Sequence, residues 1–362
     1  MRVLHIGEYV KGGVATYVNN VLNTQKENGA IENVYLALSD YNSEQEFNII
    51  NENVYRYKYK RGIPGIFFGT LKIRGIIKEI NPDIIHLHST FAGLMVRLLY
   101  ICKRKKVKIV YCPHGWAFIM DISNAKKKLF AMIEKFLSLK TDKIINISDY
   151  EYEEAKKFGL NAKKMTTIKS GIDLHASECK ENDLSLDKEL INLLYIGRFD
   201  RAKGIDIIFD LMKNHDLPNI KLYTIGDSVL ADNEINIPRN VVSLGWIDNS
   251  NIDSYIKKFD AVIMPSRWEG FGLVALEGMK NGKAIICSNK AALPELVQDG
   301  VNGYHIDIES EEDMVKVLNS LDKDVLEEMG RNGYNILREN FTSQMMNEQI
   351  INLYTNLISK KK

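Results

Sequence analysis

The 362-residue sequence contains only four cysteines, Cys102, Cys112, Cys179 and Cys287, and no two of them form a CxxC pair. This scatter argues against a disulfide framework or a zinc knuckle, so we expect a reducing, cytoplasmic environment. No apolar run approaches the roughly 18 residues that a membrane-spanning helix needs. The N-terminal segment MRVLHIGEY has too short an apolar run for a signal peptide, so neither secretion nor membrane integration is expected.

Net charge is also nearly absent, because 48 Lys and Arg stand against 47 Asp and Glu. The charges are unevenly divided, however. Residues 1–173 hold 27 basic and 17 acidic side chains, and the rest of the chain holds 21 and 30. Halves of opposite charge suggest that the two parts face different partners; ordinary scatter of composition is the alternative. No nucleic-acid partner is expected.

Short β-branched apolar runs alternate with helical patterns along the whole chain. The strand-like runs are 2–6, 34–38, 84–88, 108–112 and 143–147 in the first half, and 191–196, 221–225, 241–244, 261–264 and 284–287 in the second. The helical patterns include 14–23, 71–80, 204–213, 250–257, 272–281, 310–320 and 323–340. This alternation predicts an α/β fold with two Rossmann-like, doubly wound parallel sheets.

A polar stretch, His175–Glu189, separates the two series of strands. We therefore expect an N-terminal domain over 1–175 and a C-terminal domain over 185–342, with a last helix, 343–362, packing back on the N-terminal domain. Ligands of open α/β sheets bind outside the carboxyl ends of the strands. Two such domains are therefore expected to face a central crevice.

In the second domain, the segment YIGRFDRAKG (195–204) follows a strand and opens a helix. It places Arg198 and Lys203 just beyond the carboxyl end of the strand. A guanidinium fork and an ammonium near a helix N-terminus suit a diphosphate, and Gly197 lets the backbone approach a ligand closely. A loop with solvated charges is the alternative.

The segment PSRWEGFGLVALEG (265–278) carries two glutamates, Glu269 in a loop after a strand and Glu277 in the second turn of the next helix. Gly270 and Gly272 let the backbone present successive N–H groups to an anion. Glu277 can accept both hydroxyls of a ribose, and Glu269 is placed for sugar hydroxyls. For an isolated pair of glutamates, a helix-terminus acid and a solvated side chain would be the better interpretation.

Together these motifs resemble the signature of the GT-B retaining glycosyltransferases of family 4, the glycosyl transferases group 1. The resemblance rests on the E-x7-E block of Glu269 and Glu277 and on the G-R-F-x-x-x-K-G block of residues 197–204. It continues in order along nearly the whole chain. The further motifs are Gly12–Val14, His114-Gly115, Ser170–Asp173 and Leu293–Glu295.

The resemblance implies a role for each of these residues. Arg198 and Lys203 would bind the donor diphosphate, Glu269 the transferred sugar and Glu277 the ribose. Backbone groups after Gly270 would meet the phosphates and the sugar, namely those of Phe271, Gly272 and Leu273. The base would lie against loops at Gly226 and at Gly245, Trp246 and Ile247. The resemblance also implies retention at the anomeric carbon, with the leaving phosphate deprotonating the acceptor.

The first domain contributes fewer distinctive residues. Gly12 and Gly13 open a helix and can approach the leaving phosphate, although a plain turn explains them as well. The resemblance implies that His114 hydrogen-bonds the donor sugar; by itself it fits a core histidine equally. His86 and His88 point the same way on one strand, which is compatible with a metal. Since no third ligand stands out, a structural role is favoured.

No metal or other cofactor is expected. The triplet Asp322-Lys-Asp324 has the DxD shape of metal-dependent glycosyltransferases, but it begins a charged helix, so we interpret it as helix-terminus acid. Arg198, Lys203 and a helix dipole can neutralise a departing diphosphate without a metal. The expected catalytic residues are His114, Arg198, Lys203 and Glu269.

Basic and apolar residues occur together in the first half. Lys103–Lys106 is strongly basic, and Ala125–Leu139 indicates an amphipathic helix with lysines beside large apolar residues. Phe67 and Phe68 lie between basic residues. Such surfaces suit an anionic membrane and a lipid-linked acceptor, although an ordinary surface helix is the alternative. We expect peripheral contact at the inner face of the cell membrane.

The leading hypothesis is a glycosyltransferase that moves a hexose or deoxyhexose from a UDP-, dTDP- or GDP-sugar to a glycan or lipid-linked saccharide. Bacterial surface polysaccharide assembly is the expected setting. A nucleotide-sugar epimerase of the same fold is the first alternative. A phosphorylase would need a pyridoxal-binding lysine, and no residue suggests itself. A non-catalytic nucleotide-sugar-binding protein would be expected to have lost Lys203 or Glu277, and both are present.

Overall fold

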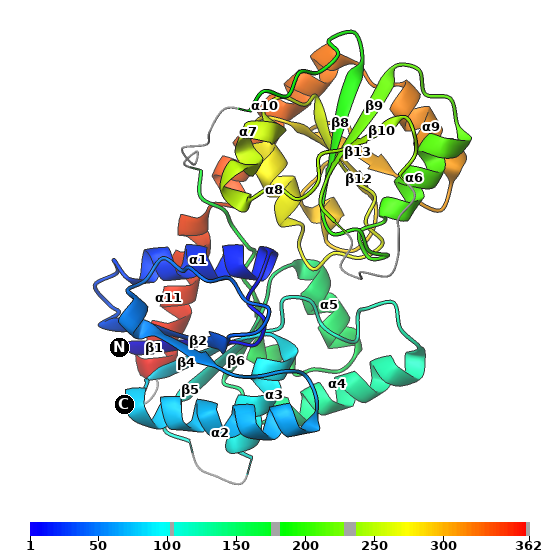
Figure 1. Cartoon of the computed structure of the whole chain (residues 1–362). Helices are drawn as coiled ribbons and strands as arrows, with labels where there is room; N and C mark the ends of the chain where they lie inside the picture. The colour runs from blue at the N-terminus through cyan, green and yellow to red at the C-terminus, as the bar shows by residue number, and fades with distance from the viewer. Residues whose placement is uncertain (102–104, 175–181, 228–236, 360–362) are drawn as a thin grey trace. The chain divides into compact units, whose positions relative to one another are not determined.

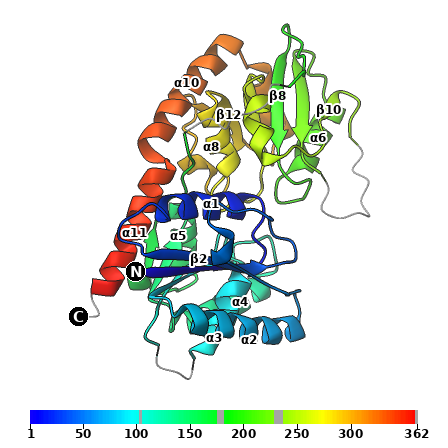
Figure 2. The same cartoon turned by 60° about the vertical axis from the view of Figure 1, so that its left-hand side comes forward.

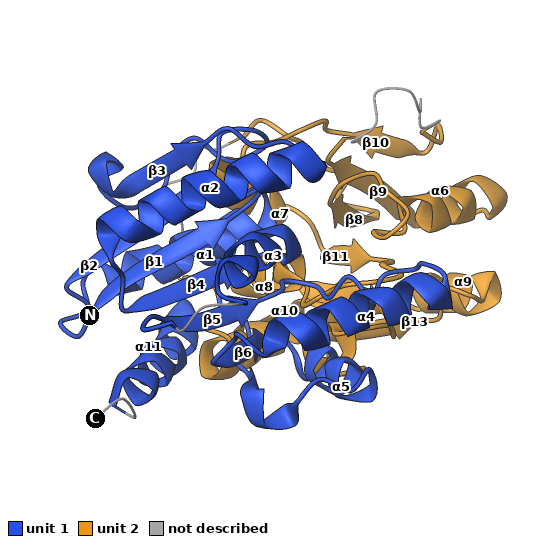
Figure 3. Cartoon of the chain, turned by 90° about the horizontal axis from the view of Figure 1, so that it is seen from below, with its two compact units in different colours: residues 1–171, 343–362 blue, residues 172–342 orange. Residues whose placement is uncertain are grey.

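The computed structural model describes residues 1–101, 105–174, 182–227 and 237–359 (Figure 1). The chain divides into two compact units, unit 1 with Met1–Gly171 and Ser343–Lys362 and unit 2 with Ile172–Thr342 (Figure 3). The division falls at Gly171, ahead of the polar stretch that suggested a boundary at 175–185. Residues 175–181 of that stretch lie outside the described part of the chain, as do Cys102, Lys103, Arg104 and Cys179.

Unit 1 contains a seven-stranded parallel sheet in the order β3-β2-β1-β4-β5-β6-β7. The strands are β1 (Arg2–Gly7), β2 (Asn33–Ser39), β3 (Val54–Tyr57), β4 (Ile84–His88), β5 (Lys108–Cys112), β6 (Lys143–Asn146) and β7 (Met165–Thr167). The α-helices are α1 (Gly13–Gln25), α2 (Ile63–Ile80), α3 (Thr90–Leu99), α4 (Asn124–Ser138), α5 (Asp149–Lys157) and α11 (Ser343–Ser359). The strand order reverses between β1 and β4.

The helices of unit 1 cover both faces of its sheet. Helices α2, α3 and α4 lie on one face, and α1 and α11 lie on the other (Figures 1 and 2). Helix α11 is fixed by polar contacts of its buried side: the Asn347 amide donates to the Asn20 carbonyl at 3.1 Å, and the Tyr354 hydroxyl lies 2.5 Å from His86 Nδ1. The last helix of the chain therefore completes the N-terminal unit.

Unit 2 contains a six-stranded parallel sheet in the order β10-β9-β8-β11-β12-β13. The strands are β8 (Ile191–Ile196), β9 (Ile220–Ile225), β10 (Val241–Ser243), β11 (Ala261–Met264), β12 (Ala284–Ser288) and β13 (Gly303–Ile306). The α-helices are α6 (Ile205–Asn214), α7 (Ile252–Ile256), α8 (Leu273–Lys280), α9 (Glu311–Asn319) and α10 (Lys323–Asn340). Here the order reverses between β8 and β11.

The predicted fold class, two doubly wound parallel sheets, is confirmed. The strands missing from the sequence-based series are β3, β7 and β13, each three or four residues long and each at the edge of its sheet. Edge strands of this length are half-exposed and lack the continuous apolar run of a central strand. Helices α3 and α5 are also absent from the predicted helical patterns, although Ser89 and Ser148 cap them by accepting from the Ala92 and Glu151 N–H groups at 3.4 and 3.1 Å.

Candidate functional site

The loops that follow β8 and β11 meet at the reversal point of the unit 2 sheet. In doubly wound sheets, ligands bind outside the carboxyl ends of the strands at this point. The two loops are joined by their backbones, since the N–H groups of Arg267 and Trp268 donate to the Ala202 carbonyl at 2.9 and 3.3 Å. Arg267 reinforces the junction through a bidentate ion pair with Asp206, at 2.7 Å for each contact.

Two glycines allow three loops to come this close. A Cβ at Gly204 would lie 1.9 Å from the Pro265 carbonyl oxygen, and one at Gly226 would lie 1.9 Å from the Gly197 carbonyl oxygen. Both residues also have positive φ, 69° and 141°, which favours glycine. The loops after β8, β9 and β11 therefore pack backbone to backbone, a packing that any side chain at either position would prevent.

Lys203 and Glu269 form an ion pair across this junction. Glu269 is 8% exposed and also accepts a hydrogen bond from the Ser266 hydroxyl at 3.3 Å. The Lys203 side chain keeps 23% of its surface exposed. The pair places a cation and a carboxylate side by side at the carboxyl ends of β8 and β11, where one can meet an anion and the other hydroxyl groups.

Arg198 lies in the same loop as Lys203 but is more open to solvent. Its guanidinium is 3.0 Å from the Asp200 carboxylate, and its side chain is 56% exposed. Its backbone carbonyl accepts a hydrogen bond from the buried Tyr195 hydroxyl at 3.0 Å, which anchors the loop. A fixed backbone with an exposed guanidinium suits an arginine that reorients toward an incoming anion.

Residues Gly270–Leu273 lead into the N-terminus of α8. Phe271 is buried and packs edge-on against the Phe341 ring, with 6.0 Å between centroids. This contact anchors the loop before α8. Gly272 caps the helix, and Leu273 is its first residue. The first N–H groups of an α-helix have no partner within the helix, so they are available to a negatively charged ligand.

Glu277 lies one turn further along α8. Burial, and secondarily the nearby Asp253 carboxylate, raise the pKa of Glu277 to about 7. Asp253 is itself held by Lys280 and by the Asn281 amide, at 2.7 and 2.8 Å. A half-buried carboxylate of this kind gains from hydroxyl donors that replace lost water.

The loop after β10 joins the same edge of the sheet. The Gly245 carbonyl accepts from the Gly226 N–H at 2.9 Å, so the loops after β9 and β10 are in contact. Trp246 is 64% exposed and Ile247 is half-buried. An exposed indole at this edge is a flat apolar surface of the kind on which a nucleobase stacks.

Gly12, Gly13 and His114 belong to unit 1. Gly12 precedes α1 and accepts the Thr16 N–H at 3.0 Å, and Gly13 is the first residue of that helix. His114 follows β5, is half-buried and has a positive φ of 52°. The Tyr17 ring packs edge-on against it, with 4.5 Å between centroids. Burial lowers the pKa of His114 to about 3, so it is neutral near pH 7.

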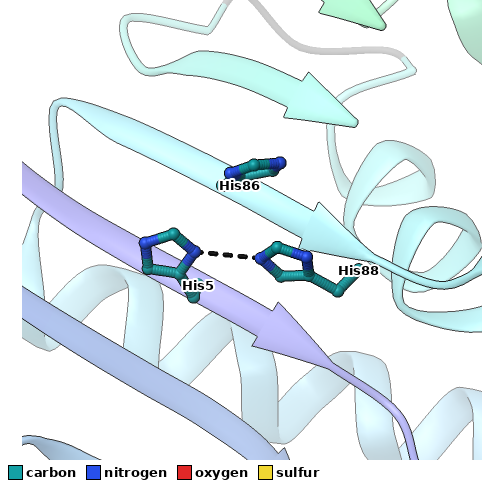
Figure 4. Close-up of side chains that lie close together, drawn as sticks. All are labelled: His5, His86 and His88. Atoms are coloured by element: carbon teal, nitrogen blue, oxygen red, sulfur yellow. Dashed lines mark hydrogen bonds between the residues drawn. The ribbon is translucent and has the colours of Figure 1, made fainter. Parts of the chain in front are cut away.

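A buried group of histidines lies at the reversal point of unit 1. His5 in β1 pairs in register with His86 in β4, and His88 is two residues further along the same face (Figure 4). No third ligand stands out beside His86 and His88 in the sequence, yet the structure places His5 with them. His5 comes from a different strand, and only strand pairing brings it there. One sign was present in the sequence, a polar residue in the middle of an apolar strand.

The geometry of these rings favours hydrogen bonding over metal binding. His5 Nδ1 lies 2.9 Å from His88 Nε2, whereas two nitrogens bound at 2.0–2.1 Å to one tetrahedral zinc would be about 3.3 Å apart. The His86 ring lies against the His88 ring, with 4.3 Å between centroids and 34° between planes. One nitrogen of each of the three rings lies within 4.8 Å of the others, and the His5–His88 distance is that of a hydrogen bond.

The Asp322-Lys-Asp324 triplet is a helix cap. The Asp322 carboxylate accepts the backbone N–H groups of Asp324 and Val325 at 3.0 and 3.1 Å, at the start of α10. Asp322 is therefore used by the N-terminus of its own helix, as the sequence predicted.

Comparison with known proteins agrees with this arrangement. The model of the glycosyl transferases group 1 matches residues 177–336, and that of Glycosyltransferase Family 4 matches residues 11–176. An uncharacterized 41.2 kDa protein in the cps region of Klebsiella pneumoniae is 37% identical over 330 residues, covering 88% of this chain and 90% of that protein.

Two further relatives are more distant. The UDP-Gal:alpha-D-GlcNAc-diphosphoundecaprenol alpha-1,3-galactosyltransferase of Escherichia coli is 24% identical over 306 residues, covering 79% of this chain and 78% of that enzyme. The Anabaena protein Alr3699/HepE, solved with UDP-glucose, aligns with a TM-score of 0.79 at 16% identity, covering 98% of this chain and all of that one. The structural likeness concerns the fold.

Proposed function

The chain belongs to the glycosyl transferases group 1 family, and we propose that it transfers a hexose or deoxyhexose from a UDP-, dTDP- or GDP-sugar with retention of anomeric configuration. The acceptor we propose is a glycan or lipid-linked saccharide in bacterial surface polysaccharide synthesis. Two relatives support this setting. One is a protein in a cps region, and the other is a galactosyltransferase that acts on a diphosphoundecaprenol-linked sugar. The observation that carries the proposal is the Lys203–Glu269 pair at the reversal point of unit 2.

The ion pair suggests how donor binding is coupled to sugar binding. Without a ligand, the Lys203 ammonium is neutralised by Glu269. In the proposed complex the diphosphate takes over that cation together with Arg198, which releases the Glu269 carboxylate to accept sugar hydroxyls. The N–H groups at the start of α8 add the partial positive charge of a helix N-terminus next to the diphosphate, so no metal is needed in this proposal.

The proposed chemistry takes place at the anomeric carbon. The bond from that carbon to the diphosphate oxygen breaks, and a bond to the acceptor oxygen forms on the same face. The acceptor proton passes to the departing phosphate oxygen, and Arg198 and Lys203 stabilise the charge that develops there. Glu277 holds the ribose and takes no part in the proton transfer.

A thermal-shift panel tests the donor site. UDP-, dTDP-, GDP- and ADP-sugars are added without metal and then with EDTA. We expect at least one to raise the melting temperature, with the shift unchanged by EDTA. Stabilisation by none of them, or a shift abolished by EDTA, would sink the proposal. Release of nucleoside diphosphate only when an acceptor is supplied then separates transfer from epimerisation, and NMR of the anomeric proton of the product tests retention.

We also propose that unit 1 contacts an anionic membrane through one surface, which we call the α2–α4 surface. Its apolar members on α2 are Ile63, Phe67, Phe68 and Leu71, and on or next to α4 they are Leu129, Met132, Ile133, Phe136 and Leu139, all exposed. Helix α3 packs against both helices, and the three helices lie on the same face of the sheet (Figures 1 and 2). An exposed apolar set of this size commonly marks an interaction site.

Helix α4 exposes large apolar residues that an ordinary surface helix would bury. Its buried face includes Glu134, which pairs at 2.8 Å with the fully buried Arg97, while Met132 and Phe136 are 61% and 53% exposed. Exposed lysines accompany the apolar residues, among them Lys126, Lys128 and Lys135. Apolar side chains ringed by cations suit an anionic lipid surface.

Among the described residues, no helix is both long and apolar enough to cross a membrane. Binding at the surface is therefore tested by co-sedimentation with vesicles of phosphatidylcholine, with and without phosphatidylglycerol. We expect binding that requires the anionic lipid and weakens with salt. No binding to the anionic vesicles at low salt would refute the membrane proposal and leave the donor-site proposal intact.

A further inference from the structure

Three imidazoles in unit 1 form a continuous line of hydrogen bonds that ends at His114. Gln25 Oε1 lies 2.8 Å from His5 Nε2, and His5 Nδ1 lies 2.9 Å from His88 Nε2 (Figure 4). His88 Nδ1 then lies 3.0 Å from His114 Nε2. The line starts on α1, crosses β1 and β4 at their reversal point and reaches the residue that follows β5. Gln25, His5 and His88 are fully buried.

Each ring in the line is uncharged near neutral pH. Burial lowers the pKa of His5 to about 4 and that of His114 to about 3, and it lowers the pKa of His88 as well. A neutral imidazole has one N–H and one bare nitrogen, so a ring that donates on one side accepts on the other. Every ring in such a line therefore donates toward the same end of the line. If the group at one end can only accept, all the rings donate toward that end.

The Gln25 amide is that group. Its oxygen faces His5, so the His5 proton lies on Nε2 and His5 Nδ1 accepts from His88 Nε2. His88 Nδ1 must then accept from His114 Nε2. An amide oxygen can only accept, so the 2.8 Å contact by itself places the proton on His5 Nε2. The Gln25 Nε2 atom is buried and has no hydrogen-bond partner among the described residues.

We infer that Gln25, His5 and His88 are positioning residues that fix the tautomer of His114, with the proton on Nε2 and a bare lone pair on Nδ1. His114 then contacts the donor as a hydrogen-bond acceptor, so the sugar group that it recognises is a hydroxyl that donates. A donor lacking that hydroxyl would leave the lone pair without a partner. This inference rests on the proposed function and on the role that the family resemblance implies for His114, a hydrogen bond to the donor sugar.

The tautomers are measured directly by NMR of the whole chain labelled with 15N in its histidines. We expect His5, His88 and His114 each to show a pyrrole-type Nε2 and a pyridine-type Nδ1. Single histidine substitutions assign the signals. Protonation of His114 on Nδ1, or a charged ring at pH 7, overturns the inference. So does a shift of the His5, His86 and His88 signals on addition of zinc, which would indicate a metal site instead.

Two variants of one residue test the direction of the line. Gln25→Glu keeps an oxygen acceptor facing His5, so the tautomer of His114 should be retained. Gln25→Leu removes the acceptor and should produce a mixture of His114 tautomers, with the fold checked by circular dichroism. A His114 tautomer unchanged in Gln25→Leu would contradict the inference.

Donor turnover supplies an independent readout. In the wild type, deoxygenating the sugar hydroxyl that contacts His114 should lower kcat/KM by about tenfold or more, and this penalty should shrink in Gln25→Leu. The same penalty in both proteins would overturn the inference. Because the NMR measurement needs no substrate, a reversed tautomer in an active transferase rejects this inference alone. The predicted tautomer in a protein that binds no nucleotide-sugar rejects the proposed function alone.

Discussion

Both units contain a doubly wound parallel sheet, with seven strands in unit 1 and six in unit 2, and they differ in the side chains that lie where the strand order reverses. In unit 2 the loops after β8 and β11 bring together Lys203 and Glu269, a charged pair. In unit 1 the neighbouring strands β1 and β4 carry His5 and His88, which are neutral imidazoles joined in line to His114. A charged pair suits a diphosphate, and a neutral polar line suits hydroxyl groups. The same fold therefore presents different polar groups at corresponding places in the two units, decided by a few side chains.

One ion pair from each unit differs from the other in how far it is enclosed. In unit 1, Arg97 and Glu134 are almost fully enclosed between α3 and α4, and the Tyr111 hydroxyl also donates to Glu134 at 3.2 Å. In unit 2, the Lys203–Glu269 pair lies in loops and keeps part of its surface exposed. An enclosed pair cannot exchange partners with a ligand, whereas a partly exposed pair can. We therefore expect the first pair to govern stability and the second to govern activity.

The largest expected effect concerns the enclosed pair. Glu134→Ala leaves the Arg97 charge buried without its partner and should lower the free energy of unfolding by about 3–5 kcal/mol. Replacing both residues with leucine should recover most of that loss. Denaturant unfolding measures both. Glu153→Ala, which breaks an exposed pair with Lys156, is the matched control and should change stability by less than about 1 kcal/mol. A loss of less than about 1 kcal/mol in Glu134→Ala would show that the Arg97–Glu134 pair does not govern stability.

The next effect concerns the loop pair. Lys203→Met removes the cation proposed to stabilise the leaving diphosphate, so kcat should fall on the order of 100- to 1,000-fold. Lys213→Met, an exposed lysine in the last turn of α6, is the matched control and should keep full activity. Steady-state release of nucleoside diphosphate measures both. Full activity of Lys203→Met would show that the pair is structural.

The ionised Glu277 carboxylate is expected to lower the stability of the folded protein and to strengthen donor binding. Its pKa is raised from 4.5 to about 7, so the folded state favours the protonated form and loses stability as the pH rises from 4.5 to 7. Glu277→Gln should therefore raise the free energy of unfolding at pH 8 by up to about 3 kcal/mol and have no effect near pH 4.5. Thermal denaturation at the two pH values checks this, with Glu312→Gln on α9 as the exposed control. An equal melting temperature at pH 8 would contradict it.

The same residue should make donor binding depend on pH. The carboxylate form accepts ribose hydroxyls, so donor affinity should fall as the pH drops below 7. Glu277→Gln should bind about tenfold more weakly at pH 8 and lose this dependence. Isothermal titration calorimetry from pH 6 to 8 gives both. An identical pH profile in the variant would assign the dependence to another group.

The smallest effect concerns the outer surfaces. Met132→Ser with Phe136→Ser removes exposed apolar groups from the α2–α4 surface and should weaken binding to anionic vesicles about fivefold without lowering catalysis of a water-soluble acceptor. Val325→Ser, an exposed apolar residue in unit 2, is the control and should leave vesicle binding unchanged. Equal losses from both variants would show that the contact is not specific to unit 1.

Sequence patterns predicted an element correctly where the apolar periodicity of that element alone identifies it. The buried strands β4, β5, β8 and β11 and the helix α10 lie where the apolar periodicity predicted them. Helix α2 begins at Ile63, eight residues before the predicted start at 71, because Phe67 and Phe68 face outward and break the apolar period there. A pattern that assumes apolar residues inside fails for a helix whose apolar residues are exposed.

Local sequence patterns specify the two α/β units, the order of the motifs and the residues from which a diphosphate site can be built, because strand and helix periodicity and glycine-rich turns are local properties. Which of these residues touch depends on how the chain folds. The Lys203–Glu269 pair joins residues 66 positions apart, and the His5–His88 bond joins residues 83 apart. Parallel strands next to each other in a sheet are separated in the chain by a crossover, so such contacts leave no local trace.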